Sequence, residues 1–261
     1  MNRMNRLLQA VSTILLAVVR VIIRPQWTRE FIASVYSFRP IPYSNTISRI
    51  RLQDAVPNSE NLCVTLRKCF LQHGNMTGEE IIAIGLLVRW KRPKRVFEFG
   101  TFNGNTTFQI ALNADSDCRI ETLNLPLGHG ETVLVSSEQD KMVHPKSMGL
   151  ELVFSGEPEA ERIHQWYGDS ATFDFSPFYG QFEFVLVDAG HEYEYVKFDT
   201  RNALKLLTKN GGLIVWHDFP NAPGVVAWLE ELSRKIRIVH INNTRLAFSE
   251  IEAESLENIV W

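Results

Sequence analysis

From residue 77 onward, short apolar runs alternate with longer segments in which apolar residues recur every third or fourth position. The short runs are rich in valine, isoleucine and phenylalanine, which predicts buried strands, and the periodic segments predict helices that pack on them. This alternation is typical of a doubly wound α/β sheet. Strands are expected at 96–99, 118–126, 162–167, 182–188 and 213–216, helices at 77–90, 105–112, 196–207 and 225–232, and a closing hairpin at 237–248.

The first 24 residues follow a different pattern. Leu7–Val19 is nearly all apolar, arginines flank it, and no acidic residue is present. The run is short for a membrane-spanning helix, which needs ~20 apolar residues, and no convincing signal-peptide cleavage site follows it. We therefore expect residues 4–23 to form a basic helix that either lies peripherally on a cytoplasmic membrane surface or packs on this domain or a partner chain. A membrane-spanning helix or a signal peptide is the third alternative.

Residues 25–76 contain four prolines and many aromatic residues, but no clear periodicity. This extension is expected either to cover the mouth of a substrate site or to bury the face of a homodimer. The predicted organisation is therefore an N-terminal helix within 1–24, an extension over 25–76, and one α/β domain over 77–261 that is large enough for its own core.

Composition narrows the class of protein. The chain has 261 residues, 22% of them charged, and a formal net charge of -3, which gives no reason to expect nucleic acid as a partner. Its three cysteines, Cys63, Cys69 and Cys118, show neither a paired framework nor metal-ligand spacing. They are expected to be reduced thiols of a cytoplasmic protein.

The strongest chemical signal lies where the strand at 96–99 meets the helix at 105. Glu98 stands inside the strand, Gly100 ends it, and Gly104 precedes the helix. Glycines let the backbone approach a ligand, and a helix N-terminus offers free N–H groups. The spacing differs from the Gly-x-Gly-x-x-Gly of dinucleotide-binding proteins. A side chain introduced by Gly104→Val is expected to enter the space of the ligand.

The ends of the next two strands should line the same ligand site, because ligands of doubly wound sheets bind at the carboxyl ends of the strands. Asn124 ends the second strand, where it would face the ribose of a nucleotide and could both accept and donate a hydrogen bond. Asp169 and Ser170 follow the third strand, where they would lie near an adenine edge or cap the next short segment. The long link over 127–160 is predicted to be a lid.

Two neighbouring strands further along end in polar side chains. Asp188 follows one strand and the pair His217–Asp218 follows the next, so these residues should face each other. Together they could hold a divalent metal, or His217 and Asp218 could form a buried structural pair. His191 lies three residues after Asp188, and its imidazole could take a proton from a hydroxyl group at neutral pH. The alternatives for His191 are a helix cap or a residue that stacks on a cofactor.

The order of these motifs resembles that of the class I S-adenosylmethionine (SAM) methyltransferases, in particular the branch of small O-methyltransferase-like proteins grouped as methyltransferase family 24. The resemblance spans about Thr77 to Glu250. It implies a Rossmann-like, mostly parallel sheet of seven strands with an antiparallel last strand. The motifs that carry it are Glu98–Thr106, Gly168–Ser170, Val187–His191, Gly211–Gly212 and His217–Asp218.

The resemblance also implies roles for single residues. Gly100, Thr101 and Gly104 would surround the methionine part of SAM, with Glu98 at the acidic position of that motif. Asn124 departs from the family, because an acid usually binds the ribose there. Asp169 and Ser170 match the segment on the adenine side. Asp188, His217 and Asp218 match the positions that hold Mg²⁺ in metal-dependent catechol-type O-methyltransferases. His191 matches the position of a general base in those enzymes.

These expectations define one preferred function and two others. The preferred one is a SAM-dependent O-methyltransferase that acts on a hydroxyl group of a small molecule, with or without Mg²⁺. The second is a non-catalytic or membrane-adaptor protein on the same fold, which Asn124 and the apolar N-terminus suggest. A nicotinamide-dependent oxidoreductase is a distant third, because the glycine spacing is wrong for it.

Overall fold

The computed structural model describes residues 46–70, 74–126 and 151–254. The helix predicted over 4–23 and most of the lid predicted over 127–160 lie outside the described residues. In the part of the chain that is described, no helix combines the length and apolar character needed to cross a membrane.

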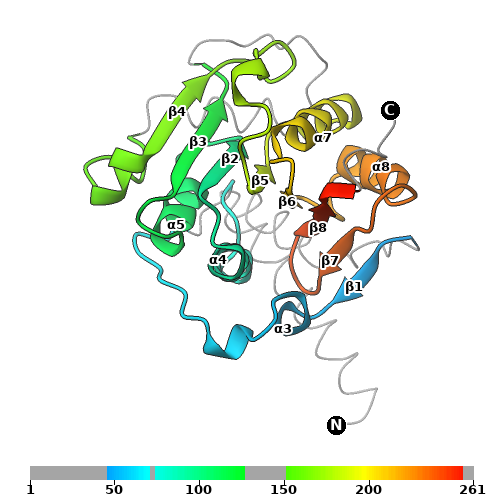
Figure 1. Ribbon diagram of the computed structural model, residues 1–261, viewed down its shortest axis with the longest axis horizontal. Helices are drawn as coiled ribbons and strands as arrows, with labels where there is room; N and C mark the ends of the chain where they lie inside the picture. Colours follow the sequence, from blue (N-terminus) through cyan, green and yellow to red (C-terminus); the bar gives the residue numbers. More distant parts are fainter. Residues whose placement is uncertain (1–45, 71–73, 127–150, 255–261) are drawn as a thin grey trace, which may run out of the picture. The chain divides into compact units, whose positions relative to one another are not determined.

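The described residues form one eight-stranded sheet (Figure 1). Its order is β1-β7-β8-β6-β5-β2-β3-β4, and all neighbours are parallel except β8, which runs antiparallel to β6 and β7. The strands are β1 Ser48–Ile50, β2 Arg95–Phe99, β3 Arg119–Asn124, β4 Ile163–Tyr167, β5 Phe184–Val187, β6 Gly211–Trp216, β7 Val239–Ile241 and β8 Ala247–Glu252.

The prediction of a mostly parallel α/β sheet with an antiparallel last strand is confirmed, and the closing hairpin is β7–β8. The sheet has one strand more than the seven that were expected. The added strand, β1, comes from the extension and pairs in parallel with β7, Ser48 opposite Val239. It occupies the edge of β7, whose backbone groups would otherwise stay unpaired.

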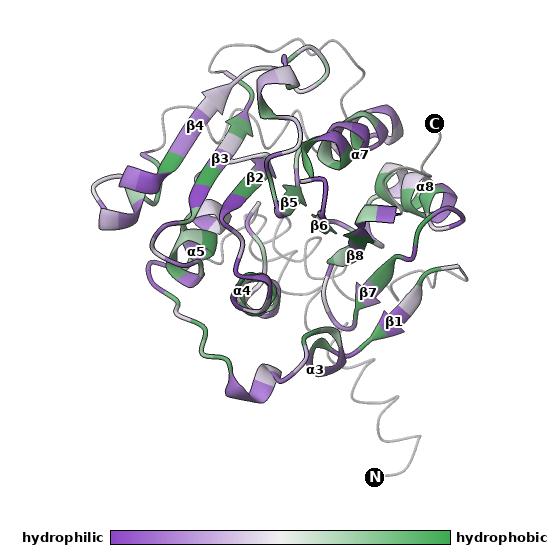
Figure 2. Cartoon of the chain, viewed as in Figure 1, coloured by the Kyte–Doolittle hydropathy of each residue, from purple (hydrophilic) through white to green (hydrophobic). Residues whose placement is uncertain are grey.

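Helices cover both faces of the sheet, as in a doubly wound fold. Alternate residues of the central strands point to opposite faces: Phe97 and Val185 pack with α7 and α8, whereas Val96 and Phe184 pack with α4 and α5. Figure 2 shows α7 and α8 with both hydrophobic and hydrophilic residues, as expected for helices with one buried side. The helices are α3 Leu52–Ala55, α4 Gly78–Lys91, α5 Asn105–Asn113, α7 Tyr193–Leu206 and α8 Pro223–Leu232, with 3₁₀ turns η2 Ser59–Asn61, η3 Pro158–Arg162 and η4 Ser176–Phe178.

Helix α4 begins with a capping box formed by Thr77 and Glu80. The Thr77 hydroxyl accepts a hydrogen bond from the backbone N–H of Glu80, and the Glu80 carboxylate accepts one from the backbone N–H of Thr77. This reciprocal arrangement satisfies two of the free donors at the helix start. It also fixes the position of Glu80, which is 1% exposed.

Residues 64–70 of the extension, here called the strap, are fastened to α5 by a ladder of side-chain amides. Asn105, Gln109 and Asn113 are spaced four residues apart, so they lie on one side of the helix. Each amide accepts from one strap N–H and donates to the C=O of the same residue, at N···O distances from 2.8 to 3.4 Å. The strap partners are Thr65, Arg67 and Phe70. Part of the extension that the sequence could not place therefore serves as a cover over α5.

Candidate active site

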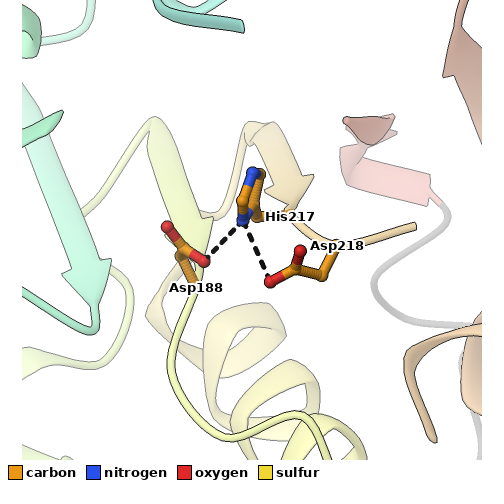
Figure 3. Close-up of side chains that lie close together, drawn as sticks. All are labelled: Asp188, His217 and Asp218. Atoms are coloured by element: carbon orange, nitrogen blue, oxygen red, sulfur yellow. Dashed lines mark hydrogen bonds and ion pairs between the residues drawn. The ribbon is translucent and has the colours of Figure 1, made fainter. Parts of the chain in front are cut away.

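The carboxyl ends of β2, β5 and β6 lie side by side at one edge of the sheet. Gly100 follows β2, Asp188 follows β5, and His217 and Asp218 follow β6. Ligand atoms of Asp188, His217 and Asp218 all lie within 4.8 Å of one another (Figure 3). The expectation that these residues face each other is confirmed, whereas their roles stay predictions.

His217 is at the centre of this cluster and is 6% exposed. Its Nδ1 lies 2.9 Å from Oδ1 of Asp188 and 3.2 Å from Oδ2 of Asp218 (Figure 3). A ring nitrogen with a bare lone pair would repel both carboxylate oxygens at these distances. A proton on Nδ1, or a cation between the three groups, is therefore needed to hold the arrangement together.

His191 joins the cluster from the loop between β5 and α7. Its Nε2 lies 2.6 Å from Oδ2 of Asp218, within the range of a charge-assisted hydrogen bond. Asp218 adopts a left-handed backbone conformation with φ of 59°. The result is an imidazole oriented by a buried carboxylate, the arrangement that many enzymes use for a general base.

Two residues that the sequence did not assign to the site complete it. Glu80, on α4, has Oε2 3.4 Å from Nε2 of His217. Arg245, in the turn between β7 and β8, donates to both oxygens of Glu80 and, through Nη1, to Oδ1 of Asp218 at 2.9 Å. The spacing of Thr77 and Glu80 in the sequence is typical of a capping box, but it does not indicate a place in the site, and no signal marked Arg245.

Neighbouring charges outweigh burial in setting the pKa values of His217, Asp218 and Glu80. Burial acts to lower the pKa of His217, but Asp188 and Asp218 raise it well above the usual value. Burial acts to raise the pKa of Asp218, yet His217 and His191 hold it well below its usual range. The pKa of Glu80 is likewise lowered, against burial, by His217 and Arg245. Glu80 and Asp218 are thus carboxylates at neutral pH.

The glycine loop after β2 is packed tightly against the protein itself. A Cβ at Gly100, whose φ is +90°, would lie 1.9 Å from the carbonyl oxygen of Asp188. At Gly104, with φ of +78°, a Cβ would lie 2.7 Å from the ring of Phe154. A side chain at 104 would therefore meet Phe154 first, so Gly104→Val would disturb packing as well as any ligand.

Glu98 is fully buried beneath this loop. Its Oε2 accepts hydrogen bonds from the hydroxyls of Thr107 at 2.5 Å and Thr122 at 2.6 Å. Its Oε1 has no hydrogen-bond partner. Burial, only partly offset by the two threonines, raises the pKa of Glu98 to about 8. An unpaired buried carboxyl oxygen is costly, which makes Glu98 a candidate for contact with a cationic ligand.

The other predicted cofactor residues follow the ends of β3 and β4. Gly100 N–H donates to the carbonyl of Leu123, and Gly168 N–H donates to the carbonyl of Asn124, so these loops are contiguous. Asp169 accepts from the N–H of Ala171 at 2.9 Å, which confirms its part in a local turn. It also accepts from the Tyr195 hydroxyl at 2.9 Å.

The remaining predicted residues lie in the same region. Thr101 is buried, and its hydroxyl lies 2.7 Å from that of Thr122. Ser170 is also buried. It opposes the effect of burial on Asp199, whose pKa burial raises to about 7.

The chain is similar to a known protein family over part of its length. A family model for a methyltransferase domain, methyltransferase family 24, matches residues 97–219, from β2 to the residue after Asp218. Residues 97–219 are therefore similar to this family, as the motif order indicated. No curated protein matches the sequence.

Several solved structures are similar to the chain. One is described as a putative O-methyltransferase from Klebsiella pneumoniae, with 16% identity, a TM-score of 0.48, and coverage of 88% of this chain and 100% of that one. Another is an O-methyltransferase from Bacillus cereus in complex with SAH, with 15% identity, a TM-score of 0.48, and coverage of 87% and 99%. A third is the O-methyltransferase TomG from Streptomyces achromogenes in complex with SAM, with 14% identity, a TM-score of 0.44, and coverage of 88% and 98%.

Proposed function

We propose that this protein transfers the methyl group of SAM to a hydroxyl oxygen of a small molecule. The observation that carries the proposal is the Asp218–His191 pair, 2.6 Å apart, at the carboxyl edge of a methyltransferase domain. A methyl transfer to oxygen needs a base for the hydroxyl proton, and this imidazole is suited to that role.

The proposed cofactor site follows the loops after β2, β3 and β4. Gly100, Thr101 and Gly104 would surround the methionine part, and Glu98 would face its positive charges. Asn124 would hold the ribose: no described residue hydrogen-bonds its side chain, which leaves one acceptor and one donor for the two ribose hydroxyls. Asp169 and Ser170 would lie on the adenine side.

The proposed chemistry is a single displacement. Nε2 of His191 donates to Asp218, so Nδ1 is the nitrogen that accepts the proton of the substrate hydroxyl, and Asp218 stabilises the imidazolium that forms. The oxygen then attacks the methyl carbon, a C–O bond forms, and the C–S bond breaks with its electron pair on sulfur. The sulfonium becomes a neutral thioether, and the proton leaves later from His191 to solvent.

The residues Asp188, His217 and Asp218 would hold a divalent cation if one binds. Their Nδ1–O distances of 2.9 and 3.2 Å are close to the ~3.0 Å expected between neighbouring ligands of an octahedral ion with ~2.1 Å bonds. A bound cation would polarise the substrate oxygen as a Lewis acid. The imidazole favours a transition metal over Mg²⁺, and Arg245 on the other oxygen of Asp218 weakens the site for any cation.

The test is calorimetric titration with SAM, followed by methyl transfer to a panel of phenols and other small hydroxyl compounds, with and without chelator. His191→Ala should retain SAM binding and lower turnover by roughly 10²–10⁴-fold. Asp188→Asn should lower turnover only in metal-loaded protein if the cation takes part. Absence of SAM binding by the wild type, or full activity of His191→Ala, would refute the proposal.

We also propose, from the sequence alone, that residues 4–23 bring the protein to an anionic membrane surface and that the extension contributes to a homodimer. Sedimentation with vesicles rich in anionic lipid should carry down the full chain but not a form starting at Pro25. Analytical ultracentrifugation of the two forms tests the dimer. Both forms remaining in the supernatant, as monomers, would contradict these proposals.

A further inference from the structure

Two of the charged residues around His217 lie outside the segment that matches the methyltransferase family. The matched segment covers residues 97–219, whereas Glu80 precedes it on α4 and Arg245 follows it between β7 and β8. Nevertheless Glu80 is 1% exposed and contacts the ring of His217. The cluster at the sheet edge is therefore built in part by elements on either side of the matched segment.

The His217 ring is held at both nitrogens. Nδ1 faces Asp188 and Asp218, and Nε2 faces Oε2 of Glu80 at 3.4 Å. If the ring turned over by 180°, carbon atoms would replace both nitrogens and all of these contacts would be lost. The contact to Glu80 is long for a hydrogen bond, but both side chains are buried, so water screens the interaction only weakly.

Glu80 itself has little freedom to move. Arg245 donates to its Oε1 from the backbone N at 2.7 Å and from Nε at 3.0 Å, and to its Oε2 from Nη2 at 2.9 Å. The backbone N–H of Thr77 donates to Oε2 at 2.7 Å. A carboxylate fixed by four donors can impose an orientation on the ring that it touches.

We infer that Glu80 is a positioning residue for the active site: it fixes the orientation of His217, so that Nδ1 is directed at Asp188 and Asp218. Outer carboxylates that orient a histidine in this way typically change metal affinity or activity by 10–100-fold when they are removed. The part of this inference that concerns turnover rests on the proposed function, whereas the orientation of the ring does not.

The test compares Glu80→Gln with Glu79→Gln. Both residues lie in the first turn of α4, but Glu79 is exposed and makes no side-chain hydrogen bond to any described residue, so it is a matched control for charge near the helix start. The ¹⁵N shifts of the His217 ring, assigned by their absence from the spectrum of His217→Asn, should change in Glu80→Gln and stay as in the wild type in Glu79→Gln. Turnover should fall about 10–100-fold in Glu80→Gln alone, with SAM affinity unchanged.

A third variant separates positioning from capping. Thr77→Ala removes the hydroxyl that caps α4 but does not touch His217, so it should lower thermal stability while the ring shifts and turnover stay near wild type. If Glu80→Gln does not fold, Glu80→Asp keeps the charge, shortens its reach, and should alter the same ring shifts. Unchanged ring shifts in a folded Glu80 variant would overturn the inference.

Failure of the inference differs from failure of the proposed function. If the wild type neither binds SAM nor transfers methyl groups, but Glu80→Gln changes the His217 shifts, the proposed function is wrong and the positioning of the ring stands. If Thr77→Ala and Glu80→Gln reduce turnover equally, without any change in the ring shifts, Glu80 acts only through the helix cap and the inference is wrong.

Discussion

Replacing Glu98 by glutamine should destabilise the protein at low pH and stabilise it at high pH. In the unfolded chain this carboxyl ionises with a pKa near 4.5, but in the folded protein burial raises its pKa to about 8. Between these values the folded state binds one more proton than the unfolded state, so stability falls by about 1.4 kcal/mol per pH unit. Over the whole interval the loss amounts to roughly 5 kcal/mol, and above pH 8 it grows no further.

The glutamine variant carries no charge and escapes this loss. It has a different cost, because its amide would place unpaired N–H groups at the position of Oε1, which has no hydrogen-bond partner. That cost is about 1–3 kcal/mol at every pH. Dividing this cost by 1.4 kcal/mol per pH unit gives the pH at which the two proteins are equally stable, roughly one to two units above 4.5. Wild type should be the more stable protein at pH 5, and Glu98→Gln the more stable at pH 8.

The assay is urea unfolding of both proteins at unit steps from pH 5 to pH 9, with the difference in free energy taken at each pH. Among the described residues, Asp199 is the other buried acid with a raised pKa, and because it is present in both proteins its effect cancels in the difference. A difference that stays constant from pH 5 to pH 9 would refute the reasoning, because it would mean that ionised Glu98 is fully stabilised in the folded protein.

Three further predictions follow from the same geometry. SAM affinity of the wild type should rise by up to about tenfold per pH unit below pH 8, because a cationic ligand favours ionised Glu98. Calorimetry should show a weaker rise in Glu98→Gln, because only the ligand itself still titrates in that complex. Gly100→Ala should fail to fold or lose several degrees in Tm by scanning calorimetry, since its Cβ would overlap the carbonyl of Asp188; wild-type Tm would contradict this. Gln109→Leu should cost roughly 1–3 kcal/mol in chemical unfolding and speed proteolysis of the strap at Arg67, and unchanged cleavage would speak against the ladder.

Sequence periodicity was sufficient for the main strands and helices from α4 onward, but not for β1 and α3 of the extension. Strands such as Phe184–Val187 are continuous apolar runs because helices bury both of their faces, and the capping box at Thr77 marks a helix start through contacts only three residues apart. The ends of parallel strands meet at one edge, so the sequence also predicted that Asp188 would lie near His217. These inferences needed only local spacing and one rule of topology.

The spacing of polar residues on α5 indicates that the helix needs polar partners, but it does not identify the strap as their source. Asn105, Gln109 and Asn113 recur every fourth residue on a buried helix, and that pattern alone shows that one side of α5 must find polar partners. It does not say which segment supplies them. The partners proved to be backbone groups of Thr65 and Phe70, and a peptide backbone has no sequence signature.

What the sequence by itself determined was therefore the order of strands and helices, the glycine loop, and the strand ends that carry Asp188, His217 and Asp218. Only the tertiary structure decided how those charges are balanced. Glu80 and His217 are 137 positions apart, and Glu80 and Arg245 are 165 apart. Coulomb attraction depends on distance in space and on burial, and the spacing of residues along the sequence gives neither. Glu80 in the helix cap and Arg245 in the turn therefore become parts of the site only in the folded chain.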